Sequence, residues 1–345
     1  MTHFENFTED SLEKAVIETL QEMDYEYAFG PDLSVDGPRP ERKDYREVIL
    51  EGRLRDTLYK LNRDLPPDAI EDVYRRVITF NSPSLIENNR HFHKLLTEGV
   101  DVSFHKNGGI KTEKAIIIDF EHPERNDFLV VNQFTIIENE NRRPDVLIFV
   151  NGLPLVVIEL KSTTDENVGI EQAYNQIQTY KQDIPSLFYY NAFCILSDGI
   201  NAKTGTITSN EERFMNWRSI DGVNVEPLDV PQYEVMIRGM LEKSRFLDII
   251  QNFILFQESK ETEYDAAGNK IGDKKTIIKI MAAYHQYFAV KKAVENTKIA
   301  TSTKGDRKIG VVWHTQGSGK SFTMFFYTAY LVKELNNGRV VKGWK

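Results

Sequence analysis

Three ionisable residues flank a pair of apolar segments in this chain of 345 residues. Asp145 precedes the apolar run at 146–150, and Glu159 and Lys161 lie at the end of a second run at 155–160. Charged groups beside apolar strands are costly unless a partner or an ion compensates them. Carboxylate oxygens are the ligands that Mg²⁺ prefers. This spacing predicts a cation site.

The register of the expected β-hairpin decides whether the two carboxylates meet. Asn151-Gly152 is a strong turn signal. A two-residue turn would place Asp145 and Glu159 on opposite faces of the sheet. A three-residue turn at 151–153 would pair them directly, with Cβ atoms ~5 Å apart. We expect the three-residue turn, because Gly152 tolerates a positive φ and a cation would relieve the repulsion.

In that arrangement Asp145, Glu159 and the carbonyl of Leu160 hold Mg²⁺ and leave positions for water. A bound cation lowers the pKa of a water and polarises a phosphodiester. Lys161 would orient that water or offset developing negative charge. From the spacing alone, a surface hairpin with a Glu159–Lys161 salt bridge fits equally well.

The residues around the hairpin resemble a known family. Pro144-Asp145 with Glu159-Leu-Lys161 resembles the PD-(D/E)xK nucleases. The surrounding sequence is similar to the R subunit of type I restriction enzymes, which is their motor and endonuclease subunit. The similar segments include Asp119-Phe-Glu-His-Pro, Asp127-Phe-Leu-Val-Val-Asn-Gln-Phe and Phe149-Val-Asn-Gly-Leu-Pro-Leu-Val-Val-Ile-Glu-Leu-Lys.

The resemblance implies further site residues. It assigns Gln176 and Tyr180 to a Gln-x-x-x-Tyr element that supports the catalytic lysine, and these two are i, i+4 neighbours on an expected helix. By analogy with related nucleases, Glu13 on the first helix would assist the metal. Asp119 is a second candidate, equally well explained as a cap at a strand end.

A phosphate-binding loop follows in the last part of the chain. Gln316-Gly-Ser-Gly-Lys-Ser321 lies between an expected strand and an expected helix, the setting that such a loop requires. Its amides and Lys320 would bind the phosphates of ATP and Ser321 a Mg²⁺ ion; the expected nucleotide contacts are Gly317, Ser318, Gly319, Lys320 and Ser321. His314 replaces the usual first glycine, as in the relaxed form that superfamily 2 helicases use. Gln286 resembles the adenine-reading glutamine of those motors.

Composition and charge bound the remaining possibilities. Hydrophobic residues make up 41% and charged residues 28%, and the single cysteine, Cys194, excludes a disulfide framework. No apolar run reaches the ~20 residues of a membrane helix, so we expect a cytoplasmic protein without membrane contact. Residues 256–345 carry a net charge of +8 and the rest −17, which indicates two domains with different surfaces.

The alternation of apolar periods predicts an α/β protein. Expected helices lie at 11–23, 45–61, 69–79, 85–97, 170–181, 214–217, 235–256, 277–296 and 321–335, and expected strands at 115–120, 127–137, 146–150, 155–160, 192–197 and 309–313. We predict a nuclease domain with a mixed sheet at 1–258, a linker or hairpin at 259–275, and the start of a RecA-like motor lobe at 276–345.

The predicted function is Mg²⁺-dependent cleavage of double-stranded DNA, coupled in the parent enzyme to ATP-driven translocation. The resemblance implies methylation and specificity subunits as partners. Because most motor motifs are missing after the phosphate loop, we expect negligible ATP turnover by this chain itself. Two alternatives stay open: a helicase-like ATPase whose first domain only clamps DNA, and an inert subunit-docking module.

Overall fold

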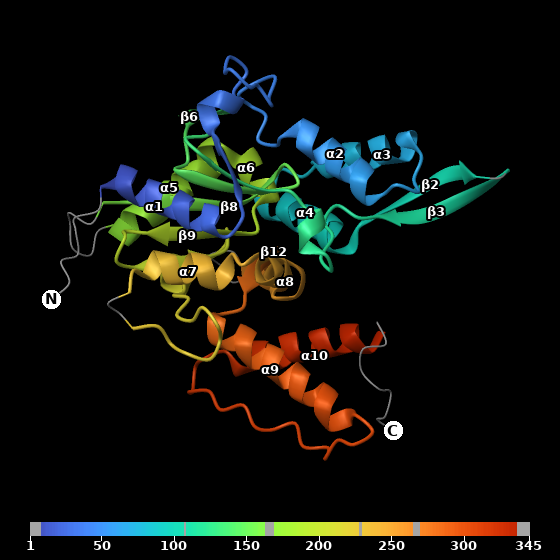
Figure 1. The fold of residues 1–345 in the computed structure, drawn as a ribbon, viewed down its shortest axis with the longest axis vertical. Helices are drawn as coiled ribbons and strands as arrows, with labels where there is room; N and C mark the ends of the chain where they lie inside the picture. The colour runs from blue at the N-terminus through green and yellow to red at the C-terminus, as the bar shows by residue number, and fades with distance from the viewer. Residues whose placement is uncertain (1–7, 107, 163–168, 228–229, 265–269, 337–345) are drawn as a thin grey trace.

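A six-stranded mixed sheet forms the centre of the protein (Figure 1). The computed structural model describes residues 8–106, 108–162, 169–227, 230–264 and 270–336. The strand order is β1-β4-β7-β8-β9-β10, and the strands are β1 (Glu26–Phe29), β4 (Phe128–Asn132), β7 (Val146–Val150), β8 (Leu153–Leu160), β9 (Phe193–Ser197) and β10 (Ala202–Gly205). The β1–β4 and β8–β9 pairs are parallel and the others antiparallel. The predicted α/β class with a mixed sheet is therefore confirmed.

Helices bury the central strands from both sides. Every residue of β7 and β8 is buried, so helices and loops must cover both faces of the sheet. The helix α1 (Glu9–Glu22) packs against α7 (Gln232–Met240), whereas α5 (Gly169–Asp183) packs against β8, β9 and α6 (Pro185–Tyr190). No helix in the described ranges is long and apolar enough to cross a membrane.

The remaining elements of the first part surround this sheet. They are η1 (Gly30–Leu33), α2 (Glu51–Leu61), α3 (Pro67–Ile78), α4 (Leu85–Glu98), η2 (Pro123–Arg125), β5 (Ile136–Ile137), β6 (Asn141–Arg142) and η3 (Glu211–Arg213), with a projecting hairpin of β2 (Val100–Lys106) and β3 (Gly109–Ala115) (Figure 1). The helix expected at 45–61 begins only at Glu51, because the amide of Leu50 donates to Gly152 O instead of to a helical carbonyl. The strand expected at 115–120 ends at Ala115.

The C-terminal part also departs from expectation. The helix expected at 235–256 is split, since Glu242 caps a second helix, α8 (Lys243–Asn252), with its side chain. A long hairpin of β11 (Ile254–Tyr264) and β12 (Lys270–Met281) follows and occupies the start of the helix expected at 277–296. The segment expected to be helical at 214–217 is extended, with a bridge between Met215 and Thr204.

Two helices complete the described chain, α9 (Tyr284–Thr301) and α10 (Lys320–Asn336). They pack against each other below the sheet (Figure 1). The apolar segment at 309–313 is not a strand, because no strand in the described ranges lies beside it to supply hydrogen bonds. The assignment of domains at 1–258, 259–275 and 276–345 stays a prediction.

Candidate metal site and phosphate loop

The hairpin β7–β8 brings the two predicted carboxylates opposite each other by an unexpected route. Asn151 and Gly152 form a two-residue turn with φ values of +56° and +78°, and Val150 pairs with Leu153. The expected three-residue turn is therefore wrong. A bulge further along β8 inserts one unpaired residue, so that Val146 pairs with Ile158. One step beyond this pair, Asp145 lies opposite Glu159.

The bulge has local causes. Pro154 has no N–H and cannot complete the ladder, which confines proline in strands to edges and bulges. The bulged residue is Leu155, and its carbonyl accepts a hydrogen bond from the Ala192 amide at 2.7 Å. The bulge thus shifts the side chains of β8 by one position relative to the turn. Asp145 and Glu159 therefore lie opposite each other, as they would with a three-residue turn.

Lys161 lies at the centre of the acidic group. Its Nζ donates to Glu159 Oε1 at 2.9 Å and to the Leu160 carbonyl at 2.9 Å, and it forms an ion pair with Glu9 on α1 at 3.6 Å. Asp145 Oδ2 accepts a hydrogen bond from the Leu160 amide at 2.7 Å. The ends of β7 and β8 and the first turn of α1 therefore meet at one place.

Burial and mutual repulsion perturb both carboxylates. Glu159 is 1% exposed, and its burial, followed by the charge of Asp145, raises its pKa to about 8. Burial also raises the pKa of Asp145 to about 6, with smaller contributions from Glu9 and Glu13. Burial acts to lower the pKa of Lys161, but the charges of Glu159, Asp145 and Glu9 and the hydrogen bond to Glu159 together outweigh it, so the pKa is raised and the lysine stays charged. One lysine thus faces several carboxylates, an arrangement that favours a bound cation.

The structure also brings Gln176 and Tyr180 to this group. Tyr180 on α5 is buried, and its hydroxyl donates to the Arg143 carbonyl at 3.4 Å. Its pKa is raised first by burial and then by the charges of Glu159 and Asp145. The Gln176 side chain acts in the opposite direction through a hydrogen bond to Tyr180. Tyr180 therefore lies close enough to both carboxylates to feel their charge, with Gln176 bonded to it, while their catalytic role stays a prediction.

Glu13 approaches the same place from α1. Its Oε1 accepts from Asn132 Nδ2 at 2.7 Å and its Oε2 from Gln133 Nε2 at 2.6 Å. Both amides lie at the end of β4, next to Asp145 in the sheet. Sequence reasoning assigned no role to Asn132 and Gln133, although two polar residues directly after a buried strand are a usable signal.

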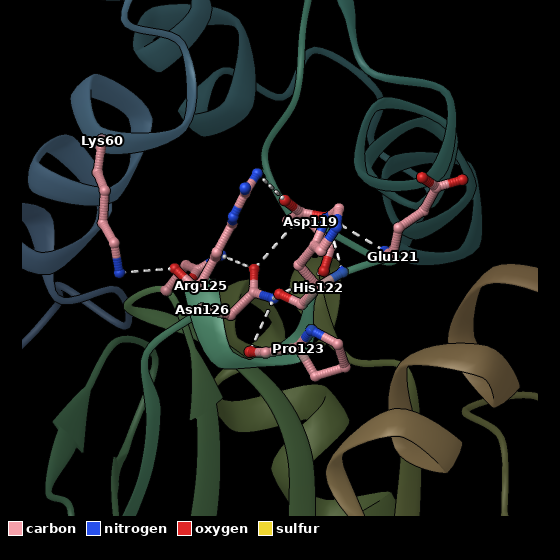
Figure 2. Close-up of polar contacts among 8 residues, drawn as sticks. Lys60, Asp119, Glu121, His122, Pro123, Arg125 and Asn126 are labelled. Atoms are coloured by element: carbon pink, nitrogen blue, oxygen red, sulfur yellow. Dashed lines mark hydrogen bonds and ion pairs between the residues drawn. The ribbon is translucent and has the colours of Figure 1, made fainter.

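Asp119 takes part in a network of hydrogen bonds and an ion pair within its own loop (Figure 2). Its carboxylate accepts from the amides of Glu121 and His122 at 3.1 and 3.0 Å and pairs with Arg125 at 3.2 Å. The Asn126 side chain bonds to its backbone on both sides. These contacts hold a loop together, so Asp119 is a structural residue and not an acid of the candidate metal site.

The oxygens available at the site suit a hard cation. Glu159 Oε2 is buried, and Lys161 bonds only to the other oxygen, Oε1; a buried carboxylate oxygen without a charged partner is costly unless a cation or solvent compensates it. In the described part of the chain, no three His, Cys, Asp or Glu side chains converge closely enough to hold a metal alone. A Mg²⁺ ion would therefore use Asp145, Glu159 and the Leu160 carbonyl together with water.

The phosphate loop precedes α10 and has the expected backbone. Gly317 and Gly319 adopt φ values of +84° and +75°, a region open to glycine. Lys320 Nζ donates to the carbonyls of His314 and Thr315 at 3.2 and 3.1 Å. Ser318 lies between the two glycines, and Ser321 lies in the first turn of α10.

Gln286 contacts the phosphate loop directly. Its Nε2 donates to the carbonyls of Ser318 and Gly319 at 3.2 and 3.1 Å, and its Oε1 accepts from the Ala283 amide at 2.9 Å. A Cβ atom at position 319 would lie 2.6 Å from this side chain. The glutamine and the loop therefore form one unit, while the adenine contact stays a prediction.

Comparisons with known proteins identify the family of this chain. The family model for the N terminus of type I restriction enzyme R proteins matches residues 6–213, and the model for SWI2/SNF2 ATPases matches residues 285–342. The HindI type I restriction enzyme endonuclease subunit of Haemophilus influenzae is 41% identical over 340 residues, covering 96% of this chain and 31% of that protein. A putative type I restriction enzyme endonuclease subunit, MjaIXP, of Methanocaldococcus jannaschii is 34% identical over 350 residues, covering 94% of this chain and 32% of that protein.

The chain thus spans about a third of the length of these curated relatives. The first family model covers more than half of the chain and includes Asp145, Glu159 and Lys161. On this match, the chain belongs to the family of type I restriction enzyme R proteins and represents their N-terminal region.

Proposed function

We propose that this chain is the Mg²⁺-dependent nuclease region of a type I restriction enzyme and hydrolyses phosphodiester bonds of double-stranded DNA. One observation carries the proposal: the buried carboxylate of Glu159 and the half-buried carboxylate of Asp145 lie opposite each other across the hairpin, and Lys161 is bonded to Glu159 at only one of its two oxygens. A structural salt bridge pairs one lysine with one carboxylate, whereas a cation site uses two carboxylates in close proximity, as Asp145 and Glu159 are here.

The side chains have distinct tasks in this mechanism. Asp145, Glu159 and the Leu160 carbonyl would hold Mg²⁺, which when bound lowers the pKa of a water and polarises the phosphodiester. Lys161 remains charged beside Glu159 and offsets negative charge that develops on the phosphate. Tyr180 and Gln176 fix the geometry from α5, because ligands work only when a second set of contacts orients them.

The phosphate loop extends the proposal to ATP. Lys320 and the amides of 317–321 would bind the β- and γ-phosphates, with Lys320 leaving the carbonyls of His314 and Thr315. In the longer protein, ATP hydrolysis would drive DNA translocation and deliver DNA to the nuclease region. Methylation and specificity subunits would select the site, since the described chain contributes phosphate-directed chemistry rather than base recognition.

Metal binding by the chain itself tests the core of the proposal. Mn²⁺ titrated into the wild-type chain in a calorimeter should bind at one site, and Asp145→Asn and Glu159→Gln should each abolish that binding. Asp119→Asn is the matched control, because Asp119 is also buried but all its contacts lie in a separate loop. Binding that survives in Glu159→Gln, or that is lost equally in Asp119→Asn, would refute the proposed metal site.

Activity requires the complete enzyme. With the nuclease region joined to its full motor and assembled with methylation and specificity subunits, circular DNA should be cut in the presence of ATP and Mg²⁺. The same assembly carrying Glu159→Gln should translocate and hydrolyse ATP without cutting. Cleavage by that variant at the wild-type rate would show that another site does the chemistry.

A further inference from the structure

Among the described residues, one acidic side chain at the edge of the candidate metal site is hydrogen-bonded only by uncharged groups. Glu13 accepts one hydrogen bond at each carboxylate oxygen, from Asn132 Nδ2 at 2.7 Å and from Gln133 Nε2 at 2.6 Å. Two amide donors orient the carboxylate without neutralising it. We call Asn132 and Gln133 the amide clamp.

The clamp is itself held in place. Asn132 Oδ1 accepts a hydrogen bond from the Tyr27 hydroxyl at 3.1 Å, so the amide group must turn its Nδ2 toward Glu13. Gln133 has a φ of +55°, an unfavourable conformation for a residue with a side chain, which surrounding structure must enforce. Its own amide donates to the Asp145 carbonyl at 3.1 Å. The clamp thus links Glu13 to the backbone of a predicted metal ligand.

The charge of Glu13 reaches the site. It contributes to the raised pKa of Asp145, along with Glu9. Glu9 is paired with Lys161, whereas the hydrogen bonds of Glu13 come from neutral amides. Since no third acidic side chain in the described residues is close enough to complete a metal cluster, Glu13 would act from outside the coordination shell, through a metal-bound water or through its charge.

We infer that Asn132 and Gln133 are positioning residues that hold Glu13, uncompensated, as an outer carboxylate of the cation site formed by Asp145 and Glu159. The inference rests on the proposed function, because it assigns the clamp to that same site. An oriented outer carboxylate raises cation affinity, and loss of such second contacts typically costs about 10- to 100-fold in metal binding.

Backbone packing explains why the clamp can form here. A Cβ atom on Gly30 would lie 2.5 Å from the Asn132 carbonyl and 2.7 Å from that of Gln133. Only glycine permits the β1 end to approach the clamp this closely. Close backbone packing against Gly30 therefore fixes the positions of Asn132 and Gln133 at the end of β4.

Mn²⁺ binding to the whole chain, measured by calorimetry at one fixed pH, distinguishes positioning from mere stability. Gln133→Asn keeps an amide that tolerates a positive φ but is too short to reach Glu13, and Asn132→Leu removes the other donor at similar volume. Each should weaken Mn²⁺ binding about 10-fold, as should Glu13→Gln. The double variant Glu13→Gln/Gln133→Asn should be no weaker than Glu13→Gln alone, because the clamp acts only through Glu13.

The control is Asn62→Leu, which removes a buried amide that bonds to Leu58 and Ile116 elsewhere in the fold. It should lower the melting temperature and leave Mn²⁺ affinity unchanged. Unchanged affinity in both clamp variants, or additive losses in the double variant, would overturn the clamp. If instead Glu159→Gln still binds Mn²⁺ like the wild type, the proposed metal site itself fails, which separates the two ideas.

Discussion

Replacing Glu159 by glutamine should stabilise the metal-free protein at alkaline pH. The pKa of Glu159 is raised from its ordinary value of 4.5 to about 8, so the folded state holds a proton that the unfolded chain releases. Stability therefore falls as the pH rises from 4.5 to 8 and stays reduced above it. Glutamine resembles the protonated acid and escapes this loss.

The size of the effect follows from the pKa. A rise from 4.5 to about 8 corresponds to roughly 5 kcal/mol as an upper limit. Because Asp145 shares the same repulsion and its own pKa is about 6, we expect about 2–3 kcal/mol. For a chain of this size, that difference raises the melting temperature by roughly 3–6 °C.

The assay is thermal unfolding of wild-type chain and Glu159→Gln in EDTA at pH 5 and pH 8.5. The two should melt together at pH 5, and the variant should melt higher at pH 8.5. Saturating Mn²⁺ should reverse that order, since only the wild type gains from binding. Asp119→Asn should instead be destabilised at both pH values, because its carboxylate is fully hydrogen-bonded and its pKa is lowered. Equal melting of wild type and Glu159→Gln at pH 8.5 would refute the reasoning.

Three further predictions concern lysines and one concerns the turn. In the assembled enzyme, Lys161→Ala should abolish DNA cleavage and retain ATPase activity, and unchanged cleavage would remove it from the catalytic set. Lys320→Ala should lose ATP binding by the chain, measured by calorimetry, and wild-type ATP turnover should be negligible; turnover abolished by the substitution would contradict this. Burial lowers the pKa of Lys279 from 10.5 to about 7, so stability should rise with pH between 7 and 10.5, and Lys279→Met should flatten the rise in melting temperature from pH 8 to pH 10. Gly152→Ala should lower stability by at least 1 kcal/mol in denaturant unfolding, because its φ is +78° and a Cβ would lie 2.5 Å from the Leu50 carbonyl; unchanged stability would show that the turn relaxes.

Much of the sheet could be predicted from sequence because its strands are buried on both faces. The apolar runs at 146–150, 155–160 and 192–197 correspond to β7, β8 and β9. The hairpin of β2 and β3 was missed although Val100, Val102 and Phe104 alternate with polar residues along β2, because β3 is mostly polar and exposed and offers no matching pattern. The run at 309–313 is apolar but unpaired, which shows that a strand depends on its neighbours as well as on its own residues.

The candidate site was predictable in its residues but not in its construction. Asp145 and Glu159 can share a face of the sheet only if the hairpin contains one extra residue, because side chains alternate between faces along a strand. The extra residue was predicted to lie in the turn. Pro154 indicates instead that it lies in a bulge within β8. Two polar residues at the end of a buried strand mark Asn132 and Gln133 as candidates, but their contact with Glu13 on α1 is long-range and could not be predicted from local sequence.

The bulge at Leu155 adds one residue to β8, so every residue of β8 after Leu155 is shifted by one position in its pairing with β7. The Ala192 amide holds the bulge by its hydrogen bond to the Leu155 carbonyl, so the acidic end of β8 keeps a register one residue away from that of the turn end. Deleting Leu155 alone would rotate Glu159 out of the site, and adding one residue to the Asn151-Gly152 turn would rotate it back. Lineages of this fold can therefore exchange a bulge for a longer turn, and a one-residue gap between two such sequences need not mark any change in chemistry.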